Sequence, residues 1–388
     1  MDATAQSESG AEPIDLEGVS KTFPDGSVGV KEVNLHFAAG ELSVLVGPSG
    51  CGKTTTMKMI NRIIEPSTGR ILLGGEDVTK VDPHQLRRRI GYVIQNVGLF
   101  PHQSIRNNVA TVPRLLGWDK TKTADRVEDL LTTVGLDPAT FGDRYPHQLS
   151  GGQRQRAGVA RALAADPSVL LMDEPFSAVD PVVRERLQSE FLRLQDAVRK
   201  TIVFVTHDIE EAVRLGDRIA VMSEGGRVEQ FASPAELLGK PATEFVADFV
   251  GADRGLKRLA VTDIDPADLE HPPVVHVNDS LAEVRAVLDR AGARWAVVLD
   301  DNEELHGWIS HDRAQGAGTI VQNGRRMEAW VSADASLKSA FSQMLQLEAG
   351  WVAVLDGGRF LGVLTPESLH SALRRSVDGT VPETAGAV

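Results

Sequence analysis

The segment that most constrains the fold is GPSGCGKT, residues 47–54, because it joins two runs of different periodicity. LSVLVG, residues 42–47, is short, apolar and ends in glycine, which predicts a buried strand. KTTTMKMINRI, residues 53–63, follows and predicts a helix. Glycines at such a junction let backbone N–H groups close around phosphate oxygens, and the positive end of the helix dipole adds attraction. The sequence therefore predicts a phosphate-binding loop.

The spacing G-x-x-x-x-G-K-[ST] in this loop is typical of a site for the triphosphate of ATP. The Lys53 ammonium is expected to reach the β- and γ-phosphates, and the Thr54 hydroxyl is expected to ligate Mg²⁺. We expect the whole loop to bind ATP through these residues: Gly47, Pro48, Ser49, Gly50, Cys51, Gly52, Lys53, Thr54 and Thr55.

Two more apolar runs, SVLLMDE at residues 168–174 and TIVFVTH at residues 201–207, predict buried strands. Near-continuous apolar strands belong in parallel sheets that are covered on both faces. The run between them predicts a helix, since its apolar residues recur every three or four positions: Val183, Leu187, Phe191, Leu194 and Val198. Strands and helices alternate in this way from residue 14 to about residue 250, which predicts an α/β domain.

The predicted strands at residues 168–174 and 201–207 both end in polar residues. The carboxyl ends of parallel strands lie at one edge of their sheet, and ligands bind at that edge. We expect Asp173 to hold Mg²⁺ and Glu174 to polarise a water molecule as general base. The two side chains are expected to diverge, because neighbours on a strand point to opposite faces. His207 is expected to contact the γ-phosphate, since it ends the next strand.

The composition limits the class of protein. The chain has 388 residues, enough for two or three domains, and its formal net charge of −13 argues against a nucleic-acid partner. Cys51 is the one cysteine, so no disulfide framework is present and a reducing compartment is expected. No apolar run approaches the roughly 20 residues that span a bilayer. The run Arg87-Arg88-Arg89 is expected to be a solvated edge, and residues 1–13 and 377–388 are expected to be disordered tails.

An internal repeat begins after about residue 255, where residues 277–310 match residues 331–365. The aligned pairs are Leu281 with Leu337, Trp295 with Trp351, Asp300 with Asp356 and Gly307 with Gly362. Each copy predicts a strand, an amphipathic helix, a second strand, a turn and a third strand. This order resembles a tandem pair of CBS domains, which implies an α+β unit over residues 255–376, with copies at about 255–315 and 325–376.

Five stretches in chain order resemble the ATPase subunit of an ABC transporter: GPSGCGKT, VIQNVGLFP, LSGGQ, LLMDEP and VTHD. The resemblance covers roughly the first 250 residues. It implies an α/β P-loop nucleotide-binding domain of the ABC type over residues 14–250, with a helical subdomain at about 97–165. It also implies ATP and Mg²⁺ as the ligands of that domain.

The resemblance adds site residues that the strand pattern does not supply. Gln95 resembles the glutamine that touches Mg²⁺ and the attacking water and senses the permease. Asp180 resembles the aspartate of the D-loop, although Val179 stands where the family more often has leucine. Phe23 resembles the aromatic residue that stacks on adenine. The family's signature loop corresponds to Leu149, Ser150, Gly151, Gly152 and Gln153.

This signature loop predicts a homodimer. In the family it binds the ATP that the other subunit holds, and Ser150 with the following amides begins a helix, which is a ready anion site. One domain would otherwise offer two anion pockets to a single triphosphate. Two copies arranged head to tail are therefore expected to share two sites, so that ATP closes the dimer and hydrolysis opens it.

The resemblance further implies a separate integral-membrane permease, with this chain at the cytoplasmic face of the plasma (inner) membrane. Residues 95–102, which include Leu99, Phe100 and His102, are expected to contact the permease coupling helix, and ordinary subdomain packing is the alternative. KTTTMKMINRIIEPSTGRI and the tandem CBS tail resemble importers of quaternary amines such as glycine betaine, choline, carnitine and proline betaine. An extracytoplasmic substrate-binding protein is implied as a further partner.

Several alternatives stay open. An importer of another amine or amino acid would share these motifs. A non-transport ABC ATPase usually has two ATPase domains or a coiled-coil insertion, and intact catalytic positions argue against a regulatory pseudo-ATPase. The CBS pair is expected to regulate, by sensing adenine nucleotide or ionic strength or by dimerisation alone. GWISHDR and GVLTPES both depart from the nucleotide-binding pattern at its last position, which Arg313 and Ser368 occupy.

Overall fold

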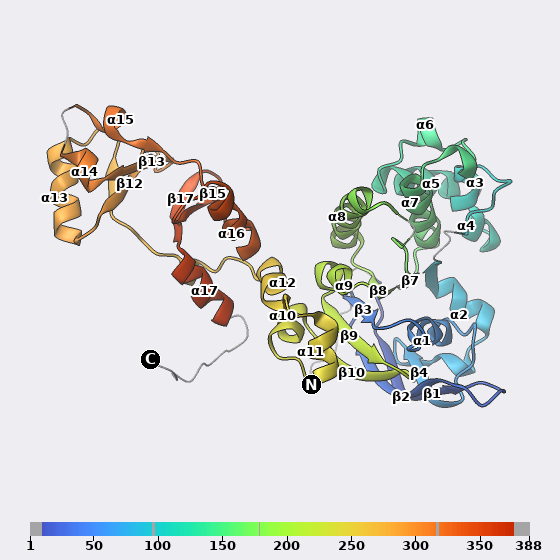
Figure 1. The fold of residues 1–388 in the computed structure, drawn as a ribbon. Coiled ribbons are helices and arrows are strands. Elements are labelled where there is room, and N and C mark those ends of the chain that lie inside the picture. The colour runs from blue at the N-terminus through green and yellow to red at the C-terminus, as the bar shows by residue number, and fades with distance from the viewer. Residues whose placement is uncertain (1–9, 95–97, 178, 316–317, 376–388) are drawn as a thin grey trace, which may run out of the picture. The chain divides into compact units, whose positions relative to one another are not determined.

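The computed structural model describes residues 10–94, 98–177, 179–315 and 318–375. It divides into two compact units, which Figure 1 shows. The first unit runs to Leu237 and includes Pro241–Gly251, and the second includes Leu238–Lys240 and continues from Ala252. Apart from residues 10–13, the two predicted tails lie outside the described residues.

A six-stranded sheet with the order β10-β9-β3-β8-β7-β6 forms the centre of the first unit. All pairs in it are parallel except the edge pair of β10 with β9. Every residue of β3 and β8 is buried, and so is β7 up to its last residue, which confirms the predicted α/β fold with a parallel sheet covered on both faces. The strands are β3 (Leu42–Val46), β6 (Ile90–Val93), β7 (Val169–Asp173), β8 (Thr201–Thr206), β9 (Arg218–Ser223) and β10 (Arg227–Ala232).

A second, antiparallel sheet with the order β2-β1-β4-β5 accompanies the first, and the sequence analysis did not predict it. Its strands are β1 (Ile14–Thr22), β2 (Val28–Phe37), β4 (Thr68–Leu73) and β5 (Glu76–Asp77). Ile14 and Phe37 from this sheet share one buried apolar cluster with Leu45 of β3, Val205 of β8 and Met57 of helix α1 (Lys53–Ile60). The helix that follows the phosphate-binding loop is therefore buried against both sheets.

The helices of the first unit fall into two groups along the chain. Those next to the sheets are α1, α2 (Pro83–Arg89), α8 (Pro181–Val198), α9 (Ile209–Leu215), α10 (Pro234–Gly239) and α11 (Glu244–Val250), with the 3₁₀ turn η1 (Val78–Lys80). Those between β6 and β7 are α3 (Ile105–Val109), α4 (Thr111–Leu115), α5 (Lys120–Thr133), α6 (Pro138–Phe141) and α7 (Gly151–Leu163), with η2 (Pro146–Gln148). Figure 1 shows this second group gathered together, in the region where a helical subdomain was predicted.

The second unit repeats one arrangement of strands and a helix. In the first copy β11 pairs in parallel with β12, and β12 pairs antiparallel with β13; in the second copy β15, β16 and β17 pair in the same way. The first copy comprises β11 (Val274–His276), α13 (Leu281–Ala291), β12 (Trp295–Leu299), β13 (Leu305–Ser310), α14 (His311–Ala314), α15 (Ile320–Asn323) and β14 (Arg325–Arg326). The second comprises β15 (Trp330–Ser332), α16 (Leu337–Gln346), β16 (Val352–Asp356), β17 (Arg359–Leu364) and α17 (Pro366–Arg375); α12 (Arg254–Ala260) and η3 (Pro266–Asp268) precede both.

The aligned tryptophans of the two copies meet each other. The rings of Trp295 and Trp351 stack with centroids 4.2 Å apart and an interplanar angle of 9°. Trp308 of β13 stands edge-on to Trp351, with centroids 6.5 Å apart. Aromatic pairs of this kind contribute stability beyond the area that they bury. Residues that align in the sequence repeat therefore also contact each other between the two copies.

Replacing Leu288 in α13 with alanine is expected to destabilise the second unit by about 2–5 kcal/mol, because Leu288 is fully buried and its removal leaves a cavity. Leu345 in α16 is 63% exposed, so Leu345→Ala is the matched control and is expected to change the free energy of unfolding by under ~0.5 kcal/mol. Urea unfolding followed by tryptophan fluorescence measures both, since Trp295, Trp308, Trp330 and Trp351 lie in this unit. Equal effects of the two substitutions would contradict the packing described.

Candidate nucleotide site

The phosphate-binding loop lies between β3 and α1, and its backbone is closely packed. A side chain at Gly47 would place its Cβ 2.1 Å from the carbonyl oxygen of Met222, so only glycine fits. Lys53 is buried, and its ammonium donates hydrogen bonds to the carbonyl oxygens of Gly47 (2.7 Å) and Pro48 (2.9 Å). Cys51 is also buried, with its Sγ 3.7 Å from the Lys53 Nζ. The loop thus encloses a single cationic group.

Thr54 and Asp173 meet at the mouth of this loop, although they lie far apart in the sequence. The Thr54 hydroxyl donates a hydrogen bond of 3.0 Å to the Asp173 carboxylate. Burial raises the pKa of Asp173, the hydrogen bond from Thr54 opposes this, and the charge of Glu174 adds to the rise. A hydroxyl beside a carboxylate that is poorly solvated gives the hard oxygen ligands that Mg²⁺ prefers. These two residues therefore fit the predicted metal site.

The sequence predicted that Glu174 diverges from Asp173 through strand alternation, but Glu174 does not belong to the strand. β7 ends at Asp173, and Glu174 has a φ of 43°, a left-handed conformation that is rare for residues other than glycine. The Glu174 N–H donates to the Val205 carbonyl oxygen (3.0 Å), and its own carbonyl oxygen accepts from the Ser177 hydroxyl (2.9 Å). Backbone strain of this kind is typical of functional sites.

The side chain of Glu174 meets His207. The carboxylate oxygen Oε2 lies 3.1 Å from Nδ1 of His207, whose side chain is 60% exposed. His207 follows β8, and the next residue, Asp208, caps α9 by accepting hydrogen bonds from the amides of Glu210 and Glu211. The structure thus brings together Lys53, Thr54, Asp173, Glu174 and His207 at the carboxyl edge of the parallel sheet, where the sequence predicted them.

Phe23 lies in the turn after β1, next to the helix that follows the phosphate-binding loop. A Cβ built on Gly29 would lie 2.7 Å from the Phe23 ring and 3.5 Å from Cγ2 of Thr55, so these two side chains flank the same glycine. The Lys21 ammonium is 5.7 Å from the centroid of the Phe23 ring. Phe23 is half-buried beside Thr55, and its contact to adenine stays a prediction.

The signature loop forms the N-terminus of α7. Ser150 caps this helix: its hydroxyl accepts from the Gln153 amide (3.3 Å), and the Gln153 side chain accepts from the Ser150 amide (2.9 Å). Ser150 and Gly151 are exposed, whereas Leu149 and Gly152 are buried. Within the described ranges no hydrogen bond joins this loop to the phosphate-binding loop. Ser150 and Gly151 are thus the exposed residues at the start of this helix.

Asp180 and Gln95 are two further site residues that the sequence predicted. Asp180 is exposed immediately before α8, and its carbonyl oxygen accepts from the Arg184 amide (2.8 Å). Gln95 lies outside the described residues, as do Asn96 and Val97 of the predicted permease segment. Of the rest of that segment, Phe100 is 41% exposed and its ring lies 6.0 Å from that of His102.

Sequence reasoning missed Asn108, which holds this exposed segment in place. Asn108 is fully buried in α3, where its Oδ1 accepts from the Phe100 amide (2.7 Å) and its Nδ2 donates to the Phe100 carbonyl oxygen (3.1 Å). The same amide group donates to the carbonyl oxygens of Gln103 and Ser104. An asparagine on the buried face of a short helix was the only signal in the sequence.

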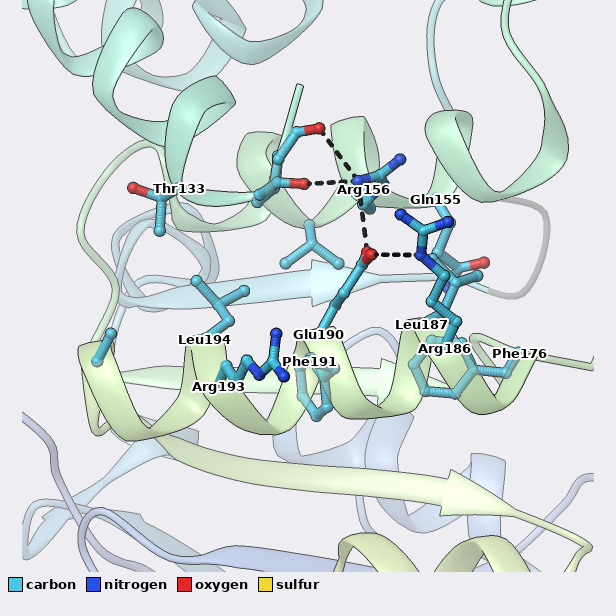
Figure 2. Close-up of a pocket in the computed structure, with 14 residues that line it drawn as sticks. Thr133, Gln155, Arg156, Phe176, Arg186, Leu187, Glu190, Phe191, Arg193 and Leu194 are labelled. Atoms are coloured by element: carbon cyan, nitrogen blue, oxygen red, sulfur yellow. Dashed lines mark hydrogen bonds and ion pairs between the residues drawn. The ribbon is translucent and has the colours of Figure 1, made fainter. Parts of the chain in front are cut away.

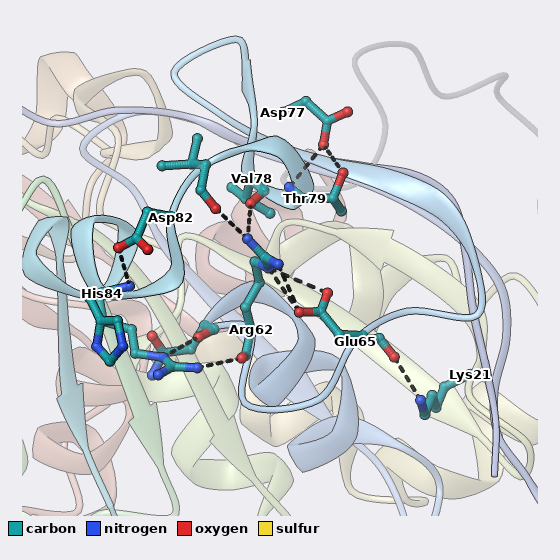
Figure 3. Close-up of polar contacts among 11 residues, drawn as sticks. Lys21, Arg62, Glu65, Asp77, Val78, Thr79, Asp82 and His84 are labelled. Carbon is teal, nitrogen blue, oxygen red and sulfur yellow. Dashed lines mark hydrogen bonds and ion pairs between the residues drawn. The ribbon is translucent and has the colours of Figure 1, made fainter. Parts of the chain in front are cut away.

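Two arginines hold the end of α1: Arg62, which Figure 3 labels and the sequence analysis did not assign, and Arg87, which was expected only at a solvated edge. Arg62 donates to the carbonyl oxygens of Val78 and Val81 and pairs with Glu65. The guanidinium of Arg87 donates to the carbonyl oxygens of Asn61 (3.2 Å) and Arg62 (2.6 Å). A cation on the last carbonyl groups of a helix satisfies them and offsets the helix dipole.

The prediction that Arg87-Arg88-Arg89 is only a solvated edge was therefore wrong in part. Arg87 ties α2 to the end of α1, and Arg89 is half-buried and pairs with Glu12 and Glu76. Arg87 and Arg88 are exposed, as predicted, although Arg87 also makes the contacts given above. The packing of α2 matters to the site because β6 follows α2 directly and pairs with β7, the strand that ends at Asp173.

In the second unit, Arg313 and Ser368 are the two residues that depart from the nucleotide-binding pattern, and the backbone amide of each donates a hydrogen bond to a side-chain hydroxyl. Ser310 accepts a hydrogen bond from the Arg313 amide (3.4 Å), and Thr365 accepts one from the Ser368 amide (3.1 Å). Both hydroxyls thus cap the helix that follows. What the CBS pair senses stays a hypothesis.

Comparison with known proteins identifies this arrangement. The family described as ABC transporter matches residues 30–177, and the family described as CBS domain matches residues 261–314. A dimeric structure of an ATP-binding cassette in a post-hydrolysis state, bound to ADP and Pi, superimposes with a TM-score of 0.51 and 32% identity, over 57% of this chain and 98% of that one. The fold and the loops around Lys53 are those of an ABC-type ATPase that binds ATP.

Relatives match over nearly the whole chain. The osmoprotectant import ATP-binding protein OsmV of Salmonella typhimurium is 45% identical over 93% of this chain and 96% of its own length. The glycine betaine/carnitine/choline transport ATP-binding protein OpuCA of Bacillus subtilis is 42% identical over 94% of this chain and 97% of its own. The chain belongs to this family of ABC-transporter ATP-binding subunits with a C-terminal CBS region, whose activity is ATP hydrolysis coupled to import.

None of the helices in the described ranges is long and apolar enough to cross a membrane. The predicted family and fold class are confirmed by these matches.

Asp173→Asn is expected to raise the melting temperature of the protein without nucleotide at pH 7. The raised pKa of Asp173 means that folding disfavours its charged form, so this carboxylate lowers stability as the pH rises through its pKa, and asparagine removes that cost. Differential scanning fluorimetry measures it. A lower melting temperature in the variant, with an unchanged dependence on pH between 4 and 7, would contradict this account of the site.

Proposed function

We propose that this chain powers the import of quaternary-amine osmoprotectants through a separate membrane permease, and that it hydrolyses ATP at sites shared between two copies arranged head to tail. The observation that carries the catalytic part is the convergence of Lys53, Thr54, Asp173, Glu174 and His207 at one sheet edge. The observation that carries the solute class is the match to osmoprotectant and glycine betaine/carnitine/choline subunits along the whole chain, CBS region included.

The phosphate-binding loop is proposed to hold the triphosphate through the backbone amides of Gly47–Thr55 and through Lys53. The buried ammonium now donates to two loop carbonyl oxygens, and phosphate oxygens of ATP would compete for the same protons. Thr54 and Asp173 would hold Mg²⁺, with Gln95 as a further ligand. A bound Mg²⁺ offsets the negative charge of the β- and γ-phosphates. Phe23 would stack on the adenine.

Glu174 is proposed as the general base. Its carboxylate contacts His207, whereas that of Asp173 accepts the hydrogen bond of Thr54, so the two acids would have separate roles. The carboxylate would accept a proton from the attacking water, and His207 would donate a hydrogen bond to the γ-phosphate from Nε2 while Nδ1 contacts Glu174. Gln95 would orient the same water.

The signature loop is proposed to complete the site of a second copy. Ser150 and Gly151 are exposed at the N-terminus of α7, where helix amides attract an anion. Closure would bring Leu149–Gln153 of one copy onto the γ-phosphate held by its partner, with Asp180 near the interface. C₂ symmetry then gives two identical sites, and loss of the γ-phosphate removes the link between the copies.

Residues 95–102 are proposed to contact a coupling helix of the permease at the cytoplasmic face of the membrane. Exposed Phe100, fixed by buried Asn108, supports a partner-facing role for this segment. The permease would receive solute from an extracytoplasmic binding protein. The CBS pair is proposed to regulate the cycle by sensing ionic strength or an adenine nucleotide, or by dimerisation alone.

Glu174→Gln is expected to lower ATP turnover by roughly 10²- to 10⁴-fold, since the amide cannot accept the proton of the attacking water. The variant should still bind ATP and should accumulate as a closed dimer. Phosphate release and light scattering measure the two effects. Glu210→Gln, at an exposed acid in α9, is the matched control and should keep normal turnover. Normal turnover in the Glu174 variant would refute the assignment.

The solute class is tested by uptake of labelled glycine betaine in cells with and without this subunit, at low and at high osmolarity. We expect uptake to require the subunit and to rise with osmolarity. Excess unlabelled choline or carnitine should compete, whereas spermidine and glutamate should not. Equal uptake in both strains would remove the quaternary-amine assignment, and competition by spermidine alone would indicate an importer of another amine.

A further inference from the structure

A cavity of about 400 Å³ lies in the first unit between α7, α8 and the last residues of α5 (Figure 2). This volume lies in the range of pockets that bind small molecules. Its lining contains no residue of the phosphate-binding loop or of the signature loop, and none of Asp173, Glu174 or His207. The nucleotide chemistry proposed above does not use it.

The floor of this pocket is apolar and well packed. It is formed by Val159 of α7, by Phe176, and by Leu187, Phe191 and Leu194 of α8, all of which are buried. The rings of Phe176 and Phe191 are 6.2 Å apart in an edge-on arrangement, which fixes the shape of the floor. A floor of this kind favours the apolar body of a ligand over a fully polar one.

Two buried donor atoms in the lining, Nε2 of Gln155 and Nε of Arg156, have no hydrogen-bond partner among the described residues. Gln155 of α7 is only 4% exposed, and its Nε2 has no hydrogen-bond partner in the part of the chain that the structure describes. A buried amide group that makes no hydrogen bond is costly, and native proteins contain few of them. An acceptor atom on a bound ligand would satisfy this group.

The charges around the pocket favour an anion. Glu190 lies between two arginines, with Arg156 Nη1 at 3.3 Å and Arg186 Nε at 3.1 Å from its carboxylate oxygens (Figure 2). Arg193, one turn further along α8, has no ion-pair partner among the described residues. The lining thus holds three arginines and one carboxylate, on a chain whose formal net charge is −13.

We propose that this pocket binds a small amphipathic carboxylate, with its apolar chain on the floor and its carboxylate accepting a hydrogen bond from Gln155 in the positive field of the arginines. The site is separate from the nucleotide site but adjoins the two helices that begin at the signature loop and after Asp180. The proposal does not rest on the identity of the transported solute.

Isothermal titration of the full chain with octanoate tests the proposal. We expect saturable binding of one octanoate per chain, and weaker or no binding of octyltrimethylammonium, which has the same chain but a cationic head. Gln155→Leu is expected to weaken octanoate binding by about tenfold, since it removes a hydrogen bond to a charged group while keeping the shape. Ala197→Phe, at an exposed lining residue, should fill the pocket and abolish binding.

Arg193→Gln is a second test for the case that the Gln155 variant fails to fold. Arg193 is exposed, so its substitution leaves the core intact. It should weaken octanoate binding severalfold, whereas Arg199→Gln, an exposed arginine outside the lining, should not change it. Three results would overturn the proposal: no binding of octanoate, equal binding of the cationic analogue, or unchanged binding in both Arg193→Gln and Ala197→Phe.

Discussion

The parallel register of β3, β8 and β7 is the constraint on which the nucleotide site depends. Val46 pairs with Thr206, and Val205 pairs with Asp173, so the three strands end together. The phosphate-binding loop, Asp173 and His207 therefore leave the sheet at one edge, although more than a hundred residues separate the loop from the other two. A slip of one residue in any of these strands would reverse which side chains face the loop. The three strands are buried almost throughout, so such a slip would also disrupt close packing on both faces of the sheet.

Much of this site could be predicted from the sequence because its signals are local. The phosphate-binding loop, the acids after an apolar strand and the histidine after the next strand are each read from a few neighbouring residues. Strand alternation does not apply to Glu174, because β7 ends at Asp173 and Glu174 has a left-handed backbone that the sequence pattern does not reveal. Asn108 and Arg87 were missed because their partners are fixed only when distant segments pack together.

The same distinction explains the rest of the fold. The internal repeat predicted two similar copies in the second unit, and the strand pairing follows that order. The stacking of Trp295 on Trp351 could not be inferred, because alignment shows equivalence and not contact. The antiparallel sheet of β2, β1, β4 and β5 was missed because polar and partly exposed residues interrupt β1 and β2, so neither is a continuous apolar run like β3 or β8. Its role is structural, as it buries α1 and so fixes the helix behind the phosphate-binding loop.

A triphosphate enclosed by two copies of the chain is the central claim of this account. The most direct test is the specific ATPase activity of the purified subunit as a function of protein concentration, for the natural chain and for Ser150→Ala, with the molecular mass followed by light scattering in the same samples. The account predicts that activity per chain falls on dilution as the dimer dissociates and that the Ser150 variant is impaired at every concentration. Constant activity per chain in a sample that is fully monomeric, together with normal activity of Ser150→Ala, would contradict it.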